Sequence, residues 1–153
     1  MKILIQKVSS AKVEVESKIV GKINKGFLIF MGVEEDDSLE DLSYIVRKVI
    51  GLRIFEDSAG KMNLNLEQVG GSLLLVSQFT LLADTRKGNR PSFNKAANPT
   101  KGNEYYHLAI DAFRRHNYTV ETGVFGAQMR VDLTNEGPVT IWIDSKDRFR
   151  SKN

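Results

Sequence analysis

The chain has 153 residues, of which 41% are hydrophobic and 27% charged, a composition that fits one globular domain and excludes a largely disordered chain. Its formal net charge of +3 permits a polyanionic partner without requiring one. Because the sequence contains no cysteine, disulfides, thiolate nucleophiles and cysteine-ligated metals are excluded. No apolar run approaches the roughly 20 residues of a membrane-spanning helix, and Gln6 and Lys7 interrupt the first apolar stretch too early for a signal peptide. We therefore expect a soluble, cytoplasmic protein with no membrane partner.

Strand patterns dominate the first part of the chain. In residues 12–16, two valines alternate with charged residues, which is the period of a half-buried strand. Segments 3–8 and 19–23 are further candidates. The continuously apolar segment 27–33 predicts a strand that is covered on both faces.

A first helix is expected between Ser38 and Gly51. Ser38 and Asp41 have the spacing of a capping box, and apolar residues then recur at helical intervals. The acidic run 34–37 in front of this helix is interpreted as a solvated linker.

A second buried strand is expected from residue 72, and polar residues interrupt it at its end. Ser77, Gln78 and Thr80 follow directly on the apolar run. Buried polar side chains need hydrogen-bond partners or a ligand that supplies them. The segment is therefore either a strand that merely emerges at an edge or a binding site.

The long segment 83–103 is expected to be a loop, and it is basic. It carries five Lys or Arg residues against one acid, Asp84. A loop of this length inside a compact domain is usually functional or disordered. Charge alone leaves two readings open for its part 86–101, a solvated surface or an arm that contacts phosphates.

The remainder predicts a second helix and more strands. Residues 104–116 have one apolar face, residues 128–133 alternate, and the segment 135–138 reads as a hairpin turn. The polar, basic tail 146–153 is expected to be frayed. We expect an α+β fold with largely antiparallel β-sheets and two helices, as a single domain over residues 1–145.

The usual catalytic signatures are missing. The sequence has no Gly-x-Ser-x-Gly elbow, Walker-type loop or dinucleotide fingerprint. His107 and His116 are the only histidines and make a poor metal site, so we interpret both as structural or surface residues and expect neither a metal nor a cofactor.

Several motifs together resemble the D-aminoacyl-tRNA deacylase family. The resemblance covers nearly the whole chain, with the motifs in order and at the spacing of the family. The residues that carry it are Ser77-Gln78-Phe79-Thr80-Leu81, Ala83-Asp84-Thr85, Gly88-Asn89-Arg90-Pro91-Ser92-Phe93 and Asn135-x-Gly137-Pro138-Val139-Thr140, with Ile5-Gln6-Lys7-Val8 and Gly60-Lys61-Met62-Asn63-Leu64-Asn65 in support.

The resemblance implies a homodimeric hydrolase of charged tRNA with its active site at the dimer interface. Such an enzyme cleaves the ester of D-aminoacyl-tRNA, and of mischarged glycyl-tRNA, with the terminal 2′-hydroxyl taking part. The segment Ser77–Thr80 of one subunit would face Gly137-Pro138 of the other, whose peptide bond is cis in the family. The family usually has arginine at the position of Lys7, and lysine loses the planar fork of donors.

The expected site residues fall into three groups. Gln78, Phe79 and Thr80 are assigned to catalysis, with backbone N–H groups around Phe79 and Thr80 stabilising the oxyanion. The expected substrate-binding residues are Ser77, Phe125, Met129, Gly137 and Pro138, and the expected tRNA contacts are Arg86, Lys87 and Arg90. The alternative is a non-catalytic nucleic-acid-binding protein that uses the basic loop 86–101.

Overall fold

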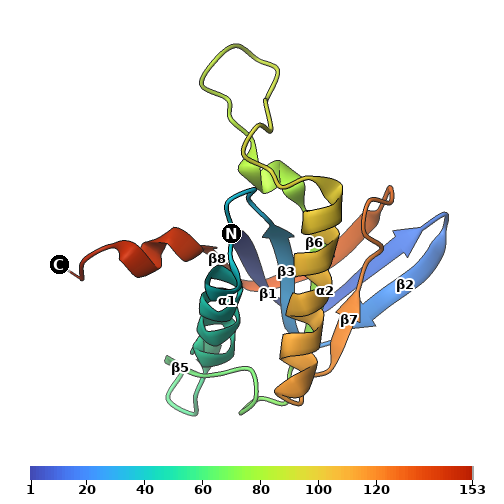
Figure 1. The fold of residues 1–153 in the computed structure, drawn as a ribbon. Coiled ribbons are helices and arrows are strands. Elements are labelled where there is room, and N and C mark those ends of the chain that lie inside the picture. The colour runs from blue at the N-terminus through green and yellow to red at the C-terminus, as the bar shows by residue number, and fades with distance from the viewer. Residues whose placement is uncertain (153) are drawn as a thin grey trace.

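A computed structural model describes residues 1–152 and shows one large sheet covered on one face by two helices (Figure 1). The strands are β1 (Lys2–Val15), β2 (Lys18–Ile23), β3 (Gly26–Gly32), β4 (Phe55–Glu56), β5 (Met62–Leu64), β6 (Ser72–Ser77), β7 (Val120–Thr122) and β8 (Arg130–Asp144). The α-helices are α1 (Leu39–Gly51) and α2 (Pro99–Arg115), and the 3₁₀-helices are η1 (Phe79–Leu82) and η2 (Ser145–Phe149). Within this described part, no helix is both long and apolar enough to cross a membrane.

The large sheet is mixed, so the expectation of largely antiparallel sheets was wrong. Its strand order is β2-β1-β3-β6-β7, and β8 pairs with β1. The long strand β1 is antiparallel to β2, β3 and β8, whereas β3–β6 and β6–β7 are parallel. Parallel neighbours need a crossover connection, and α1 and α2 lie in the two crossovers.

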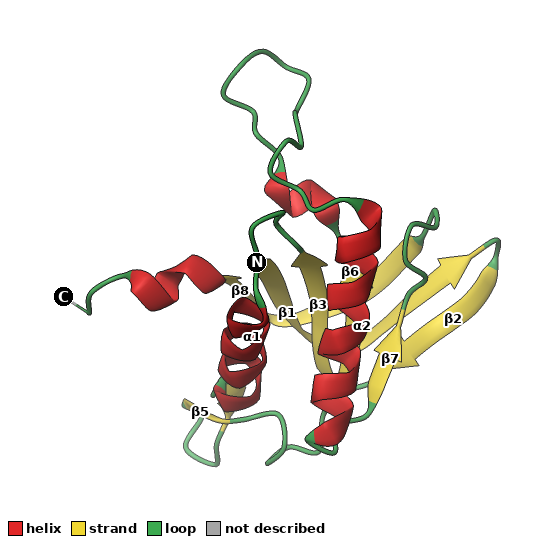
Figure 2. Cartoon of the chain, in the orientation of Figure 1, coloured by secondary structure: helices red, strands yellow, loops and turns green. Residues whose placement is uncertain are grey.

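Both faces of the central strands are covered. Alternate residues of β3 point to opposite sides, so that Phe27 and Ile29 pack under the helices and Leu28 packs on the other side. The second face is closed by the far half of β1 and by β2, which contacts β6 and β7 (Figure 2). The predicted strand with two covered faces is therefore confirmed.

The helix starts follow local capping rules. The N–H of Ser38 donates to the carboxylate of Asp41 at 2.8 Å, which confirms the expected capping pair at the start of α1. Helix α2 begins five residues before the expected position, because Asn98 accepts from the Lys101 N–H at 2.9 Å and Pro99 occupies the first turn.

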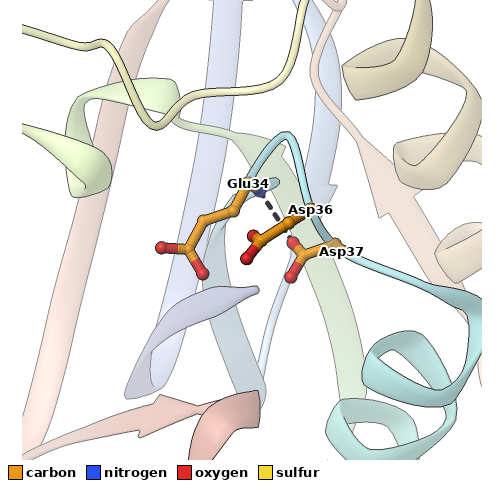
Figure 3. Close-up of side chains that lie close together, drawn as sticks. All are labelled: Glu34, Asp36 and Asp37. Carbon is orange, nitrogen blue, oxygen red and sulfur yellow. Dashed lines mark hydrogen bonds between the residues drawn. The ribbon is translucent and has the colours of Figure 1, made fainter.

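Two acids of the run before α1, Glu34 and Asp37, are buried in a charge cluster, so the interpretation as a solvated linker was wrong for them, whereas Glu35 and Asp36 are exposed (Figure 3). Glu34 and Asp37 are 2% and 5% exposed, and the ammonium group of Met1 lies 3.3 Å from Glu34 Oε2 and 2.5 Å from Asp37 Oδ1. That ammonium also donates to Ser145 Oγ at 2.8 Å, and Lys146 Nζ lies 3.0 Å from Glu34 Oε2. The cluster therefore joins the first residue of the chain to the start of η2, which is ordered where a frayed tail was expected.

The three acids of this cluster have the spacing of a cation site. Oxygen atoms of Glu34, Asp36 and Asp37 lie within 4.8 Å of one another. The positive charge that they meet is supplied by the ammonium groups of Met1, Lys2 and Lys146. The cluster is thus explained by pairing inside the protein.

Candidate active site

The carboxyl ends of two parallel strands meet below α2 and open into a cavity. In the β3–β6 pairing Met31 lies opposite Ser77, and the next N–H, that of Gln78, donates to the Met31 carbonyl at 2.8 Å. The chain then turns into η1, so that polar side chains follow directly on buried strand residues. A cavity of about 500 Å³ lies at this edge, lined by Met31, Val33, Val76, Ser77, Gln78, Phe79, Ala97, Pro99, Gly102, Phe125, Gly126, Ala127, Gln128, Met129 and Val131.

Glycines make room for the two large side chains of the far wall. A Cβ atom on Gly102 of α2 would lie 3.3 Å from the Phe125 ring, and one on Gly123 would lie 2.5 Å from Met129 Sδ. The Phe125 ring also packs near the buried ring of Tyr106, with centroids 6.1 Å apart. The segment between β7 and β8 is thereby held against α2.

Tyr106 connects this wall to β6, the strand that ends at the polar residues of the cavity. Its hydroxyl donates to the Leu75 carbonyl at 2.6 Å, inside the protein. Burial raises the pKa of Tyr106 to about 12, so the hydroxyl stays protonated and remains a donor.

Five of the expected site residues converge on the cavity. Ser77, Gln78 and Phe79 line it from the β6–η1 turn, and Phe125 and Met129 line it from the opposite side.

Thr80 lies one residue further along, outside the lining. Its hydroxyl oxygen accepts a hydrogen bond from the side-chain amide of Gln78. The two side chains therefore orient each other at the edge of the cavity.

Gly137 and Pro138 lie elsewhere in the chain, in β8, and do not line this cavity. Their peptide bond is cis, and both residues are exposed. The Asn135 side chain braces the segment, since it accepts from the Val139 N–H at 2.8 Å and donates to Thr140 Oγ1 at 3.0 Å. The Gly137-Pro138 segment is thus exposed on the surface and is held there by Asn135.

Lys7 lies opposite this braced segment. Its neighbours in β1 pair with Thr140 and Asn135, so a bulge containing Gly137 and Pro138 faces Lys7. The Lys7 side chain is mostly buried, and its ammonium lies 5.7 Å from the centroid of the Phe55 ring. Among residues 1–152, no hydrogen bond joins the Lys7 side chain to the Gly137-Pro138 segment.

None of the residues that line the cavity within the described chain carries a titratable side chain. His107 and His116 are both exposed, the first on α2 and the second at its C-terminal cap. The cavity therefore offers shape, hydrogen-bond donors and apolar contact, and no general acid or base.

The family model described as "D-Tyr-tRNA(Tyr) deacylase" matches residues 4–144. The chain belongs to this deacylase family. The resemblance read from the motifs is thereby confirmed, and the chain is placed in a family of ester hydrolases.

Curated relatives carry the same family name, and two solved structures share the fold. D-aminoacyl-tRNA deacylase of Thermosipho africanus (strain TCF52B) is 52% identical over 97% of this chain and 100% of its own, and that of Bacillus pumilus (strain SAFR-032) is 53% identical over 96% and 100%. A solved "c-Myc DNA Unwinding Element Binding Protein" is 34% identical with a TM-score of 0.89, covering 94% of this chain and 98% of its own. A probable eukaryotic D-amino acid tRNA deacylase has a TM-score of 0.82 at 17% identity, covering 93% and 97%, and shows the shared fold alone.

In this deacylase-family chain the basic loop is pinned at its base and extends away from the sheet (Figure 1). Asp84 and Ser92 bridge across it, with N–H to carbonyl distances of 2.8 and 3.0 Å. The side chain of Arg86 donates to both oxygens of Asp84, and this contact holds the pKa of Asp84 well below its usual range. Within residues 1–152, Lys87 and Arg90 have no ion-pair partner.

Sequence reasoning missed part of the cavity wall. Gly102 was placed in a loop, whereas it lies in the first turns of α2 and faces Phe125. The signal for it was the Asn98-Pro99 pair, which moves the helix start ahead of Gly102. Gln128 and Val131 also line the cavity. The alternation expected over residues 128–133 puts Val131 on the same face as Met129, whereas Gln128 had no signal beyond lying beside Met129.

Proposed function

We propose that this chain hydrolyses the ester between a D-amino acid and the terminal adenosine of tRNA, and that it also releases mischarged glycine. The observation that carries the proposal is the convergence of Ser77, Gln78 and Phe79 with Phe125 and Met129 on one cavity. An aminoacyl ester is already activated. Water attack therefore needs mainly positioning and stabilisation of the developing oxyanion.

The backbone supplies the oxyanion donors in this proposal. Phe79 and Thr80 are the first two residues of η1. Their N–H groups have no acceptor within the helix, as is general for the first N–H groups of a helix. Fixed donors of this kind stabilise charge that develops in the transition state, and losing one costs about 3 kcal/mol in known enzymes. The substrate carbonyl would point at this turn.

The nucleophile is water, and the substrate helps to activate it. The Thr80 hydroxyl accepts from the Gln78 amide, and no titratable side chain of the described cavity lining is present to make that hydroxyl a nucleophile. The terminal 2′-hydroxyl of the tRNA lies next to the ester by covalent structure. It takes the role that a protein base has in other hydrolases.

A second copy of the chain completes the site. The outer face of the sheet has an apolar row in register, in which Leu4 pairs with both Phe30 and Trp142. Trp142 is 48% exposed in the single chain, and exposed apolar rows of this kind are typical of subunit contacts. Gly137 and Pro138 lie in the same strand as Trp142, β8, so that a homodimer built on this face would present them to a partner.

The partner's backbone would impose the chirality. Rigid atoms at the position of an L side chain exclude L-amino acids, while D-amino acids place nothing there. Proline limits backbone freedom and suits this task. Since glycine has no side chain, the same device cannot reject it, which is why we include glycyl-tRNA among the substrates.

The basic loop would hold the tRNA. Lys87 and Arg90 are exposed and unpaired within residues 1–152, whereas Arg86 is engaged by Asp84. Phosphate contacts by such residues give affinity without sequence preference.

A second candidate is binding of nucleic acid without catalysis. The 34% identical solved relative is titled a DNA unwinding element binding protein, and this chain has a basic loop. Phosphate binding alone does not require the polar turn at the cavity, so we place this candidate second.

The decisive experiment compares D- and L-tyrosyl-tRNA as substrates of the purified chain, with and without a strong chelator. We expect hydrolysis of the D ester only, unchanged by the chelator because no metal takes part. Nucleic-acid binding without release of either amino acid would favour the second candidate. Activity that a chelator abolishes and a divalent ion restores would contradict the proposed chemistry.

A further inference from the structure

We propose that the rings of Phe79 and Phe93 form a platform on which the unpaired nucleotides before the terminal adenosine of the tRNA stack. The inference rests on the proposed function and names a part of the substrate that the cavity itself does not account for. It assigns a role to the Phe79 side chain that is separate from the role of its backbone N–H.

The first observation is an exposed aromatic pair at the mouth of the cavity. Phe79 lines the cavity, yet it is 56% exposed. Its ring and that of the half-buried Phe93 pack in an edge-to-face arrangement, with centroids 4.9 Å apart and an interplanar angle of 69°. Such edge-to-face contact fixes a ring while leaving a face open.

The second observation is the position of this pair between two hollows. The first is the cavity, which Phe79 lines. The second is an open depression of about 720 Å³ in the basic loop, lined by Asp84, Arg86, Lys87, Ser92 and Asn94. Ser92 and Asn94 flank Phe93 in the sequence. The aromatic pair therefore connects the two.

The charge of the loop completes the arrangement. Asp84 is neutralised by Arg86, which leaves Lys87, Arg90 and Lys95 of this loop without an ion-pair partner in residues 1–152. A cationic groove combined with exposed aromatic rings is the common arrangement for binding single-stranded nucleic acid. The 3′ end of a tRNA is such a strand. With the terminal adenosine in the cavity, the preceding bases would pass over Phe79 toward the depression.

The test separates the ring from the backbone. Phe79→Leu keeps the N–H group and an apolar side chain but removes the ring face, and Phe79→Tyr keeps the face. Each variant is assayed on D-tyrosyl-tRNA and on D-tyrosyl-adenosine, which lacks the preceding nucleotides. We expect Phe79→Leu to lower the ratio of kcat/KM for the tRNA over that for the adenosine ester by about tenfold, mainly through KM. Phe79→Tyr should retain the wild-type ratio.

A control and an independent readout accompany this assay. Phe149→Leu removes another exposed ring, far along the sequence in η2, and should leave the ratio unchanged. Binding of an uncharged RNA oligonucleotide that ends in CCA is measured in parallel, because it needs no hydrolysis. An unaltered ratio together with unaltered RNA affinity in Phe79→Leu would overturn the platform. Absence of hydrolysis by the wild-type chain, with the RNA still bound through Phe79, would overturn the proposed function instead.

Discussion

Gln78 and Thr80 are the polar side chains that the chain places at the end of an otherwise buried strand. Their side chains form a hydrogen bond with each other. The donors that remain for a ligand at this turn are the backbone N–H groups at the start of η1. The sequence pointed to these residues because polar side chains interrupted an apolar run. Phe125 and Met129 were expected at the same site only through the resemblance to the family, because no local pattern places them across from this turn.

Thr80→Val is expected to slow deacylation without abolishing it. Valine keeps the shape and the backbone N–H but removes the hydroxyl, so the loss is that of one orienting hydrogen bond, about 1 kcal/mol or roughly fivefold to tenfold in kcat. Steady-state kinetics on D-tyrosyl-tRNA measures this. A complete loss of activity, with a covalent intermediate trapped in the wild type, would show that Thr80 is the nucleophile.

Lys87→Gln combined with Arg90→Gln is expected to weaken tRNA binding and to flatten its salt dependence. Two lost phosphate contacts should lower the slope of log affinity against log salt by about 1.5. Arg86→Gln is the matched comparison, with a smaller effect because Asp84 already holds that guanidinium. An unchanged salt slope in the double variant would mean that the loop is only a solvated surface.

The elements were predicted best where the signal is local. The capping pair of α1 and the apolar run of β3 are read directly from neighbouring residues, and both were found in the structure. The interpretation of residues 34–37 as a solvated linker was wrong for Glu34 and Asp37, because their partners are distant in sequence. Lys146, which pairs with Glu34, lies more than 100 residues away from it in the sequence. The contact between Met1 and Ser145 spans 144 residues. No local sequence pattern predicts such a pairing.

Asp37→Asn is expected to destabilise the fold by about 3 kcal/mol, because it removes a buried charge that pairs with the ammonium group of Met1. Asp36→Asn is the matched control, since the Asp36 side chain is 74% exposed and pairs only loosely with Lys146 at 3.7 Å. Its effect should stay within about 0.5 kcal/mol. Urea unfolding of both variants measures the difference. Equal stability of the two would contradict the role of the cluster.

The two crossover helices determine which strands of the large sheet run parallel. Helices α1 and α2 connect β3 to β6 and β6 to β7, and a strand that is followed by a helix and a neighbouring strand returns parallel. The order of strand, helix and strand was visible in the sequence. The antiparallel expectation overlooked that these helices sit in crossovers.

Trp142→Arg is expected to yield a monomer with little change in its own stability, since Trp142 is already half exposed in the single chain. Charge in the apolar row with Leu4 and Phe30 would oppose association. Deacylation should then be lost, because Gly137 and Pro138 would no longer reach a partner. Phe149→Arg, at another exposed aromatic residue, should stay dimeric. Light scattering decides, and an active monomer would contradict the shared site.

We propose that the substrate supplies the activating hydroxyl, because no described residue lining the cavity is titratable. The most direct measurement compares D-tyrosyl-tRNA carrying an ordinary terminal adenosine with the same ester on a 2′-deoxyadenosine terminus. A positioned base usually contributes about 100-fold or more to a rate. We predict that the deoxy substrate is hydrolysed at least about 100-fold more slowly, with similar affinity. Equal rates for the two substrates would contradict the account and require a base within the protein.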